Sequence, residues 1–161
     1  MNRIILAGFD GTNNTAKLIT EQTDAPCRKL LLPNDKARSV ALLMSEIQHQ
    51  ETGCVVLLGQ KPRIKNKIAI ERCAVINGEK LYTPLDVTVS TQLIRNSGYA
   101  AYISENCGTS YCNHIYGACL EKGINCIFLH VPYTKNTDSL GDICRAVGDF
   151  VNGVAGIPCA L

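Results

Sequence analysis

Short runs of apolar, often β-branched residues alternate along this chain with longer segments of helical spacing. Such alternation favours an α/β fold, in which helices pack on the faces of a sheet. The expected strands are Arg3–Ala7, Lys29–Leu32, Cys54–Leu58, Ile68–Val75, Tyr99–Ser104 and Cys126–His130. No internal repeat or linker divides the 161 residues, so we expect a single domain spanning residues 1–161.

Two long helices are predicted between and after these strands. Asp35–Gln50 carries apolar residues at helical spacing, and Asn34 stands where it could cap the first turn. A second helix is expected from about Ser139 to Val151, with apolar residues along one face. Cys144 lies on that face and is interpreted as a small buried hydrophobic residue.

The composition excludes several classes of protein. Hydrophobic residues make up 46% of the chain and charged residues 19%, which is typical of a globular protein and not of a disordered one. A net charge of +2 is too small to indicate nucleic acid or an anionic membrane as a partner. No apolar stretch approaches the roughly 20 residues of a membrane span, so neither partner is expected.

The cysteines are expected to be free thiols. There are nine of them, an odd number without a CxxC pair, and the three histidines are scattered. We therefore expect no disulfide framework and no metal site, and a reducing cytoplasm as the location.

Two segments suggest anion binding only weakly. Gly8–Thr15 follows a strand and could hold a ligand at a helix start, but it lacks both the three-glycine fingerprint and the P-loop lysine. A tight turn is the commoner explanation. Lys61–Lys67 is the densest run of positive charge and is interpreted as a solvated loop.

The segment Ile103–Asn113 contains the strongest candidate nucleophile. If Thr109 or Ser110 caps the helix that follows, Cys112 lies in its first turn, where the helix end lowers the pKa of a thiol. A thiolate there can attack a carbonyl, and backbone N–H groups can hold the oxyanion. The alternative is an inert buried cysteine, and Cys107 in the same loop is a rival nucleophile or redox neighbour.

His130 is the candidate base for this thiol, because it follows five residues that read as a buried strand. If the relevant strands are parallel, His130 and the loop before Cys112 lie at the same edge of the sheet. Glu71, within Ile68–Val75, is the candidate carboxylate that orients the imidazole. The structural alternatives are a core histidine bonded to backbone and an ion pair of Glu71 with Arg72 or another cation.

These residues resemble the pyroglutamyl peptidase I (pyrrolidone-carboxylate peptidase) family of cysteine peptidases. The matching segments are Ile70-Glu71-Arg72, Ala74-Val75, Ala101-Tyr102-Ile103-Ser104, Gly108, Cys112-Asn113 and Leu129-His130-Val131-Pro132-Tyr133, with Gly8-Phe9, Leu32-Pro33 and Gly59-Gln60 in family order. By this resemblance Cys112 is the expected nucleophile, His130 the general base and acid, and Glu71 the residue that orients His130. Phe9 and Gln60 match residues that bind the acyl group.

The resemblance also implies the architecture and the reaction. It predicts a three-layer α/β/α sandwich around a mixed, mostly parallel sheet. The implied reaction removes an N-terminal pyroglutamyl or related small N-acyl group from a peptide or small amide, without a cofactor. Family members are cytosolic and often tetrameric, so a homo-oligomer, dimer or tetramer, is the expected assembly.

The chain departs from the family pattern around the acyl group. It is shorter, and loops are missing after Phe9, after Ile76 and near Cys119. Thr12 stands where the family has a second phenylalanine that sandwiches the ring. An arginine associated with the oxyanion has no counterpart, and Lys80 is a candidate substitute. One extra residue separates Gln60 from Glu71.

Three functions are therefore compared. The first is amide hydrolysis through an acyl-enzyme on Cys112, which predicts unusually fast alkylation of that thiol. The second is a binding or assembly protein that keeps the fold without turnover, with ordinary thiol reactivity. The third is a nucleotide or phosphate module using Gly8–Thr15 and the basic loop.

Overall fold

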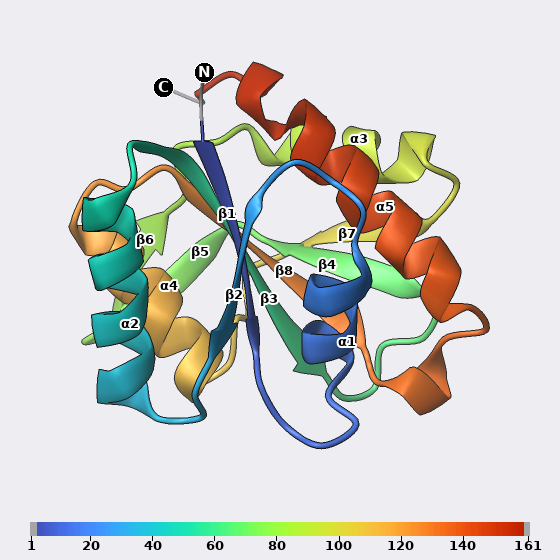
Figure 1. Cartoon of the computed structure of the whole chain (residues 1–161), viewed down its shortest axis with the longest axis horizontal. Helices are drawn as coiled ribbons and strands as arrows, with labels where there is room; N and C mark the ends of the chain where they lie inside the picture. The colour runs from blue at the N-terminus through green and yellow to red at the C-terminus, as the bar shows by residue number, and fades with distance from the viewer. Residues whose placement is uncertain (1–2, 160–161) are drawn as a thin grey trace.

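A central six-stranded sheet organises the protein, whose computed structural model describes residues 3–159. The strands lie in the order β2-β1-β3-β8-β4-β7 (Figure 1). Their bounds are β1 (Arg3–Phe9), β2 (Arg28–Leu32), β3 (Thr52–Lys61), β4 (Lys67–Glu71), β7 (Ala100–Ser104) and β8 (Cys126–Pro132). A separate antiparallel hairpin consists of β5 (Cys73–Ile76) and β6 (Glu79–Tyr82).

Helices cover both faces of the sheet (Figure 1). One face carries α1 (Thr15–Gln22), α3 (Val87–Asn96) and α5 (Leu140–Gly153), and the other carries α2 (Lys36–His49), α4 (Tyr111–Glu121) and the β5–β6 hairpin. Two 3-10 turns are Thr134–Asn136 and Val154–Gly156. Within residues 3–159, no helix has the length and apolar character needed to cross a membrane. The predicted α/β/α fold with a mixed, mostly parallel sheet is confirmed.

The direction of the strands changes once across the sheet. β2, β1, β3 and β8 are parallel, β4 is antiparallel to β8, and β7 is parallel to β4. The strands before Cys112 and around His130, which are β7 and β8, therefore run in opposite directions. The parallel arrangement on which the expected shared edge depended is therefore absent, because β4 and β7 form a reversed pair beside β8. β8 is also the element that joins this pair to the other strands.

Two apolar clusters fill the space between the sheet and its helices. The cluster under α1, α3 and α5 includes Phe150 and Val147, and Val154 and Ile157 of the C-terminal segment pack into it. From the sequence alone, the tail Asn152–Leu161 could pack on this core or on a neighbouring subunit; its last residue, Leu161, lies outside the described residues. The opposite cluster, under α2 and α4, includes Phe128.

Gly8 shows how closely α1 approaches the sheet. A Cβ atom at this position would lie 2.7 Å from the carbonyl oxygen of Ala16 and would also meet the hydroxyl of Thr20. Any larger residue at Gly8 would push α1 off β1, so the glycine permits the close packing.

Several predicted boundaries differ from the structure. α2 is capped by Asp35, whose carboxylate accepts from the backbone N–H of Arg38 at 2.7 Å, while Asn34 donates to the carbonyl of Asp10 instead. The expected strand Ile68–Val75 divides after Glu71 into β4 and β5, because Arg72 leaves the sheet and the chain enters the hairpin. Cys144 is only half-buried and packs at the margin of the core.

Candidate active site

A buried acid and a buried base are hydrogen-bonded where β4 meets β8. The Nδ1 of His130 donates to Oε1 of Glu71 at 2.9 Å. Both side chains are almost fully buried, at 4% and 0% exposed. The antiparallel register places Glu71 opposite Phe128 and Ala69 opposite His130, so the two functional side chains lie on the same face of the sheet. This bond leaves Nε2 of the imidazole as a free acceptor.

Lys61 forms the third member of this group. Its Nζ donates to Oε1 of Glu71 at 3.1 Å and to the carbonyl of Asn106 at 2.7 Å. The sequence suggested a solvated loop, which is wrong for this residue, because the last position of β3 turns its side chain toward β4. The ion pair of Glu71 expected with Arg72 or another cation is therefore formed by Lys61, and Arg72 instead approaches Glu105 at 3.9 Å.

The environment stabilises a neutral imidazole beside an ionised carboxylate. Burial favours a raised pKa at Glu71, but the hydrogen bond and charge of His130, together with the charge of Lys61, lower the pKa overall. Burial lowers the pKa of His130 and outweighs the opposing effect of Glu71, while the Lys61 cation lowers it further. A neutral imidazole held by a carboxylate is prepared to accept a proton.

The thiol of Cys112 lies directly above Gly59. A Cβ atom at Gly59 would be 2.6 Å from Sγ of Cys112 and 2.9 Å from Cζ of Phe128. Gly59 is the partner of His130 in the β3–β8 register, so the thiol and the imidazole occupy neighbouring positions on one face. Among the described residues, Cys112 makes no side-chain hydrogen bond to His130, and Phe128 packs against that ring at 4.7 Å between centroids.

The expected low pKa at Cys112 is wrong for this conformation. Burial raises the pKa of the thiol to about 12, and the charge of Glu71 adds to this, while Lys61 and the residue's own backbone N–H oppose it only in part. Cys107, the rival nucleophile, is 5% exposed, and burial raises its pKa strongly. Cys107 does not line the pocket that Cys112 reaches.

The first turn of α4 offers uncommitted backbone donors. Ser110 occupies the N-cap position but its side chain makes no capping hydrogen bond. Within residues 3–159, the backbone N–H groups of Tyr111, Cys112 and Asn113 have no hydrogen-bond acceptor in another residue, and that of Cys112 faces its own thiol. The side chain of Asn113 holds this turn in place through a reciprocal pair of 2.8 Å hydrogen bonds with the backbone of Val75. The turn can therefore stabilise negative charge next to the thiol.

A pocket of about 330 Å³ opens onto Cys112. Its lining residues are Phe9, Asn14, Asn34, Gly59, Gln60, Ser110, Tyr111, Cys112 and Tyr133. The pocket thus brings the predicted acyl-binding residues Phe9 and Gln60 together with the predicted nucleophile. The Oε1 of Gln60 accepts from the backbone N–H of Thr15 at 3.1 Å, which directs the amide NH₂ to other acceptors. Tyr111 and Tyr133 were not predicted to line this pocket.

Other residues considered in the sequence lie elsewhere. Lys80 is on β6 and approaches Glu105 at 3.7 Å, and it does not line the pocket, so the backbone of α4 is the better placed group for an oxyanion. Thr12 is exposed in a turn outside the pocket. Asn14 caps α1 by accepting from the N–H groups of Ala16 and Lys17, so that helix start has satisfied its own donors.

No metal centre accompanies this site in the part of the chain that the structure describes: His, Cys, Asp and Glu side chains do not gather there in groups of three or more that could hold an ion.

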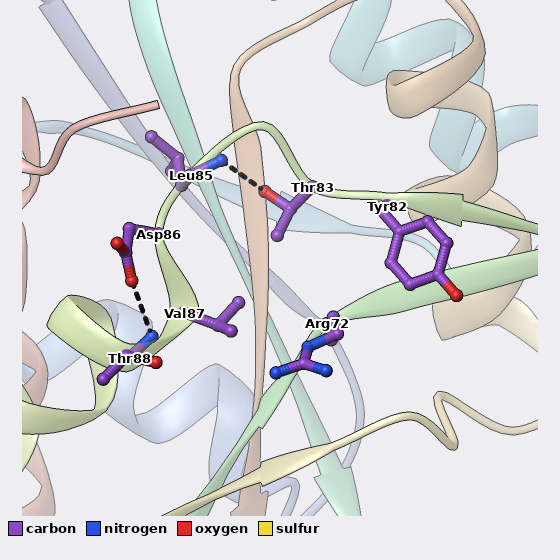
Figure 2. A pocket seen from close by; sticks show the side chains of 7 residues that line it. All are labelled: Arg72, Tyr82, Thr83, Leu85, Asp86, Val87 and Thr88. Carbon is purple, nitrogen blue, oxygen red and sulfur yellow. Dashed lines mark hydrogen bonds between the residues drawn. The ribbon is translucent and has the colours of Figure 1, made fainter. Parts of the chain in front are cut away.

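A second, larger pocket of about 410 Å³ lies apart from the predicted residues. Figure 2 shows its lining by Arg72, Tyr82, Thr83, Leu85, Asp86, Val87 and Thr88. The carboxylate of Asp86 accepts a hydrogen bond from the backbone N–H of Thr88. The hydroxyl of Thr83 accepts from the backbone N–H of Leu85 and donates to the backbone carbonyl of Cys126. These polar groups serve the fold, so the smaller pocket at Cys112 is the better candidate site.

Comparison with known proteins identifies similar chains. The pyrrolidone-carboxylate peptidase of Thermosipho melanesiensis is 23% identical over an alignment of 198 positions, which covers 94% of this chain and 98% of that protein. The enzyme of the same name from Thermococcus litoralis is 26% identical over 84% of this chain and 79% of its own length. The resemblance to the pyroglutamyl peptidase I family is confirmed. No family model matches the chain.

Solved structures of pyroglutamyl peptidases share the fold. Pyroglutamyl peptidase I from Bacillus amyloliquefaciens superposes with a TM-score of 0.81 at 23% identity, covering 96% of each chain. Pyrrolidone carboxyl peptidase from Fervidobacterium islandicum has a TM-score of 0.86 at 17% identity, covering 98% of this chain and all of that one. The fold is therefore that of the pyroglutamyl peptidases across nearly the whole chain.

Proposed function

We propose that this protein is a cysteine peptidase that removes an N-terminal pyroglutamyl group, or a related small N-acyl group, from peptides. The observation that carries the proposal is the hydrogen-bonded pair of Glu71 and His130 beside Cys112. The similarity in sequence to named pyrrolidone-carboxylate peptidases supports the same activity.

In the proposed mechanism, Nε2 of His130 takes the proton of the Cys112 thiol as Sγ attacks the acyl carbonyl. The negative charge on the carbonyl oxygen is held by the backbone N–H groups of the first turn of α4. His130 then donates the proton to the leaving amine as the C–N bond breaks, which leaves a thioester on Cys112. Water, deprotonated by His130, then attacks the thioester carbonyl, the C–S bond breaks to release the acid, and the imidazolium returns its proton to Sγ of Cys112. Glu71 keeps the imidazole in the required tautomer and stabilises its charged form.

The high pKa of Cys112 fits a mechanism in which thiol and imidazole are both neutral at rest. The proton then moves only as the substrate binds and the carbonyl approaches Sγ. Catalytic hydrogen bonds are often long or absent before the substrate arrives, so the missing bond between Cys112 and His130 is compatible with this sequence of events.

The test is hydrolysis of a pyroglutamyl fluorogenic amide by the reduced protein, compared with Cys112→Ala and, as a matched control, Cys144→Ala. We expect turnover in the parent and in Cys144→Ala, and at least a 10³-fold loss in Cys112→Ala. Mass spectrometry of the parent during turnover should detect an acyl adduct on Cys112. Equal activity of the parent and Cys112→Ala would refute the assignment of the nucleophile.

A second candidate is a non-catalytic binding protein on the same fold. It is favoured by the resting state of Cys112, whose raised pKa and missing bond to His130 give an unreactive thiol. This candidate predicts no hydrolysis by the parent, and alkylation of Cys112 by iodoacetamide no faster than that of the half-buried Cys27 and Cys144.

A further inference from the structure

Tyr111 and Phe9 form an aromatic pair across the pocket at Cys112. Their ring centroids are 6.1 Å apart and their planes are inclined by 37°. Phe9 is only 3% exposed at the end of β1 and is therefore a fixed wall, whereas Tyr111 is 38% exposed at the start of α4. Both residues line the pocket. The pair thus combines one rigid aromatic surface with one that has room to move.

Among the residues that line the pocket, Tyr111 is the one whose ring contacts Phe9 in the part of the chain that the structure describes. Thr12, which stands where the family has its second phenylalanine, is exposed and lies outside the pocket. Tyr133 lines the pocket, but no stacking contact joins its ring to Phe9 within the described residues. The observed pairing with Phe9 therefore makes Tyr111 the better candidate for a second wall.

The spacing of the two rings suits a thin, flat group. Carbon atoms in contact lie about 3.5 Å apart, so a planar ring between two aromatic faces needs them about 7 Å apart. A small outward rotation of the exposed Tyr111 side chain would open the present 6.1 Å separation to that value. A bulky or branched acyl group would need a much larger displacement.

The position of Tyr111 also connects binding to the reacting atom. Tyr111 immediately precedes Cys112 on the first turn of α4, so a ring held against it lies next to the thiol. On the β3 side, the uncommitted NH₂ of Gln60 can donate to a ring carbonyl, because its oxygen is already bonded to Thr15. The pocket therefore combines two aromatic faces, an amide donor and the candidate nucleophile.

We propose that Tyr111 is a specificity-determining residue, the second wall of an aromatic clamp that closes on a flat lactam ring. The inference rests on the proposed function for the identity of the acyl group. In the family a second phenylalanine packs on the other side of the ring, and Thr12 stands at that position here. The inference assigns this contact to Tyr111 of α4.

The test measures binding separately from hydrolysis. In a Cys112→Ser background, the affinity for 2-pyrrolidone, a bare lactam, is measured by NMR titration. We expect Tyr111→Ala to weaken binding about 10-fold, the amount typical for loss of one aromatic contact, and Tyr111→Phe to stay within two-fold of the parent. Tyr82→Ala removes an exposed tyrosine outside this pocket and should leave the affinity unchanged.

The same variants are then compared with an open-chain amide, N-methylacetamide. The clamp predicts that Tyr111→Ala loses most of the preference for the lactam over the open-chain amide. Lactam binding that is absent from the parent, or unaffected by Tyr111→Ala, would overturn the inference. Lactam binding that depends on Tyr111, without hydrolysis by the protein that retains Cys112, would refute the proposed function and leave the clamp standing.

Discussion

The two faces of the sheet differ in the polar groups that they bury, and the face under α1, α3 and α5 holds the larger apolar cluster. Under α1, α3 and α5, the buried polar groups are hydroxyls such as Thr20 and Thr91, which bond the carbonyls of their own helices. Within residues 3–159, the buried carboxylate and the buried imidazole, Glu71 and His130, both lie on the opposite face. Oε1 of Glu71 accepts from both His130 and Lys61, which offsets the cost of burying the charge, while Oε2 has no hydrogen-bond partner among the described residues. The face under α1, α3 and α5 therefore mainly stabilises the fold, while the face under α2 and α4 has a smaller apolar cluster and also holds the candidate acid–base pair.

The largest expected effect is on the charged face. Glu71→Gln removes the charge that fixes the tautomer of His130, and we expect kcat/KM to fall about 10³- to 10⁴-fold. Glu105→Gln removes a half-exposed carboxylate from the neighbouring loop and should leave kcat/KM within two-fold. Steady-state kinetics on both variants, with circular dichroism to check folding, make the comparison. A Glu71→Gln enzyme within 10-fold of the parent would reduce Glu71 to a structural partner of Lys61.

Two glycines, one on each face of the sheet, test whether one face serves stability and the other serves activity. Gly59→Ala forces Sγ of Cys112 and the ring of Phe128 to move, so we expect about a 100-fold loss of kcat/KM. Gly8→Ala forces α1 off β1 and should cost about 1–3 kcal/mol of stability, with kcat/KM of the folded protein little changed. Urea denaturation measures the free energy of unfolding of both variants, and steady-state kinetics measure kcat/KM. The comparison fails if Gly8→Ala loses as much activity as Gly59→Ala.

The smallest effect concerns the pH dependence. His130 must be neutral to accept a proton, and its lowered pKa places the acid limb of kcat/KM below the usual histidine value of 6.5. Because the Lys61 cation opposes protonation of His130, Lys61→Ala should raise that pKa and move the acid limb to higher pH. Activity at about pH 6 should then fall roughly three-fold relative to pH 8.

Lys65→Ala is the matched control for this experiment, since Lys65 is exposed in the same loop. Its pH profile should coincide with that of the parent. A Lys61→Ala enzyme with reduced kcat but an unmoved acid limb would argue that Lys61 acts on the fold alone and has no influence on the titration of His130.

Much of the fold was predictable from the sequence because most strands of the sheet are continuous apolar runs. β6 was missed, since three of its four residues are exposed and give no alternating pattern. α3 begins with Val87, Thr88 and Val89, a β-branched run without helical propensity, and it forms because Asp86 caps it and its inner face packs on β7 and α5. Local patterns could not supply that tertiary contribution.

The site was predictable in its residue types but not in its electrostatics. The positions of Glu71, Cys112 and His130 followed from motif spacing and from the family resemblance. The contact of Lys61 with Glu71 depends on the strand order, in which β4 lies two positions from β3 with β8 between them, and no local pattern predicts that order. The pKa of Cys112 depends on burial against Gly59 and Phe128, which is also tertiary. The catalytic roles, the single-domain boundary, the cytoplasmic location and the homo-oligomeric state stay predictions.

The place of β8 has a consequence for how the protein is made. β8 lies between β3 and β4, yet it is the last strand of the sheet to leave the ribosome. Until residues 126–132 emerge, the strands β2-β1-β3 and the pair β4-β7 each present an unpaired apolar edge, the kind of surface on which chains aggregate. Insertion of β8 closes both edges and, in the same event, carries His130 to Glu71. The nascent chain therefore acquires its acid–base pair only when its sheet is complete.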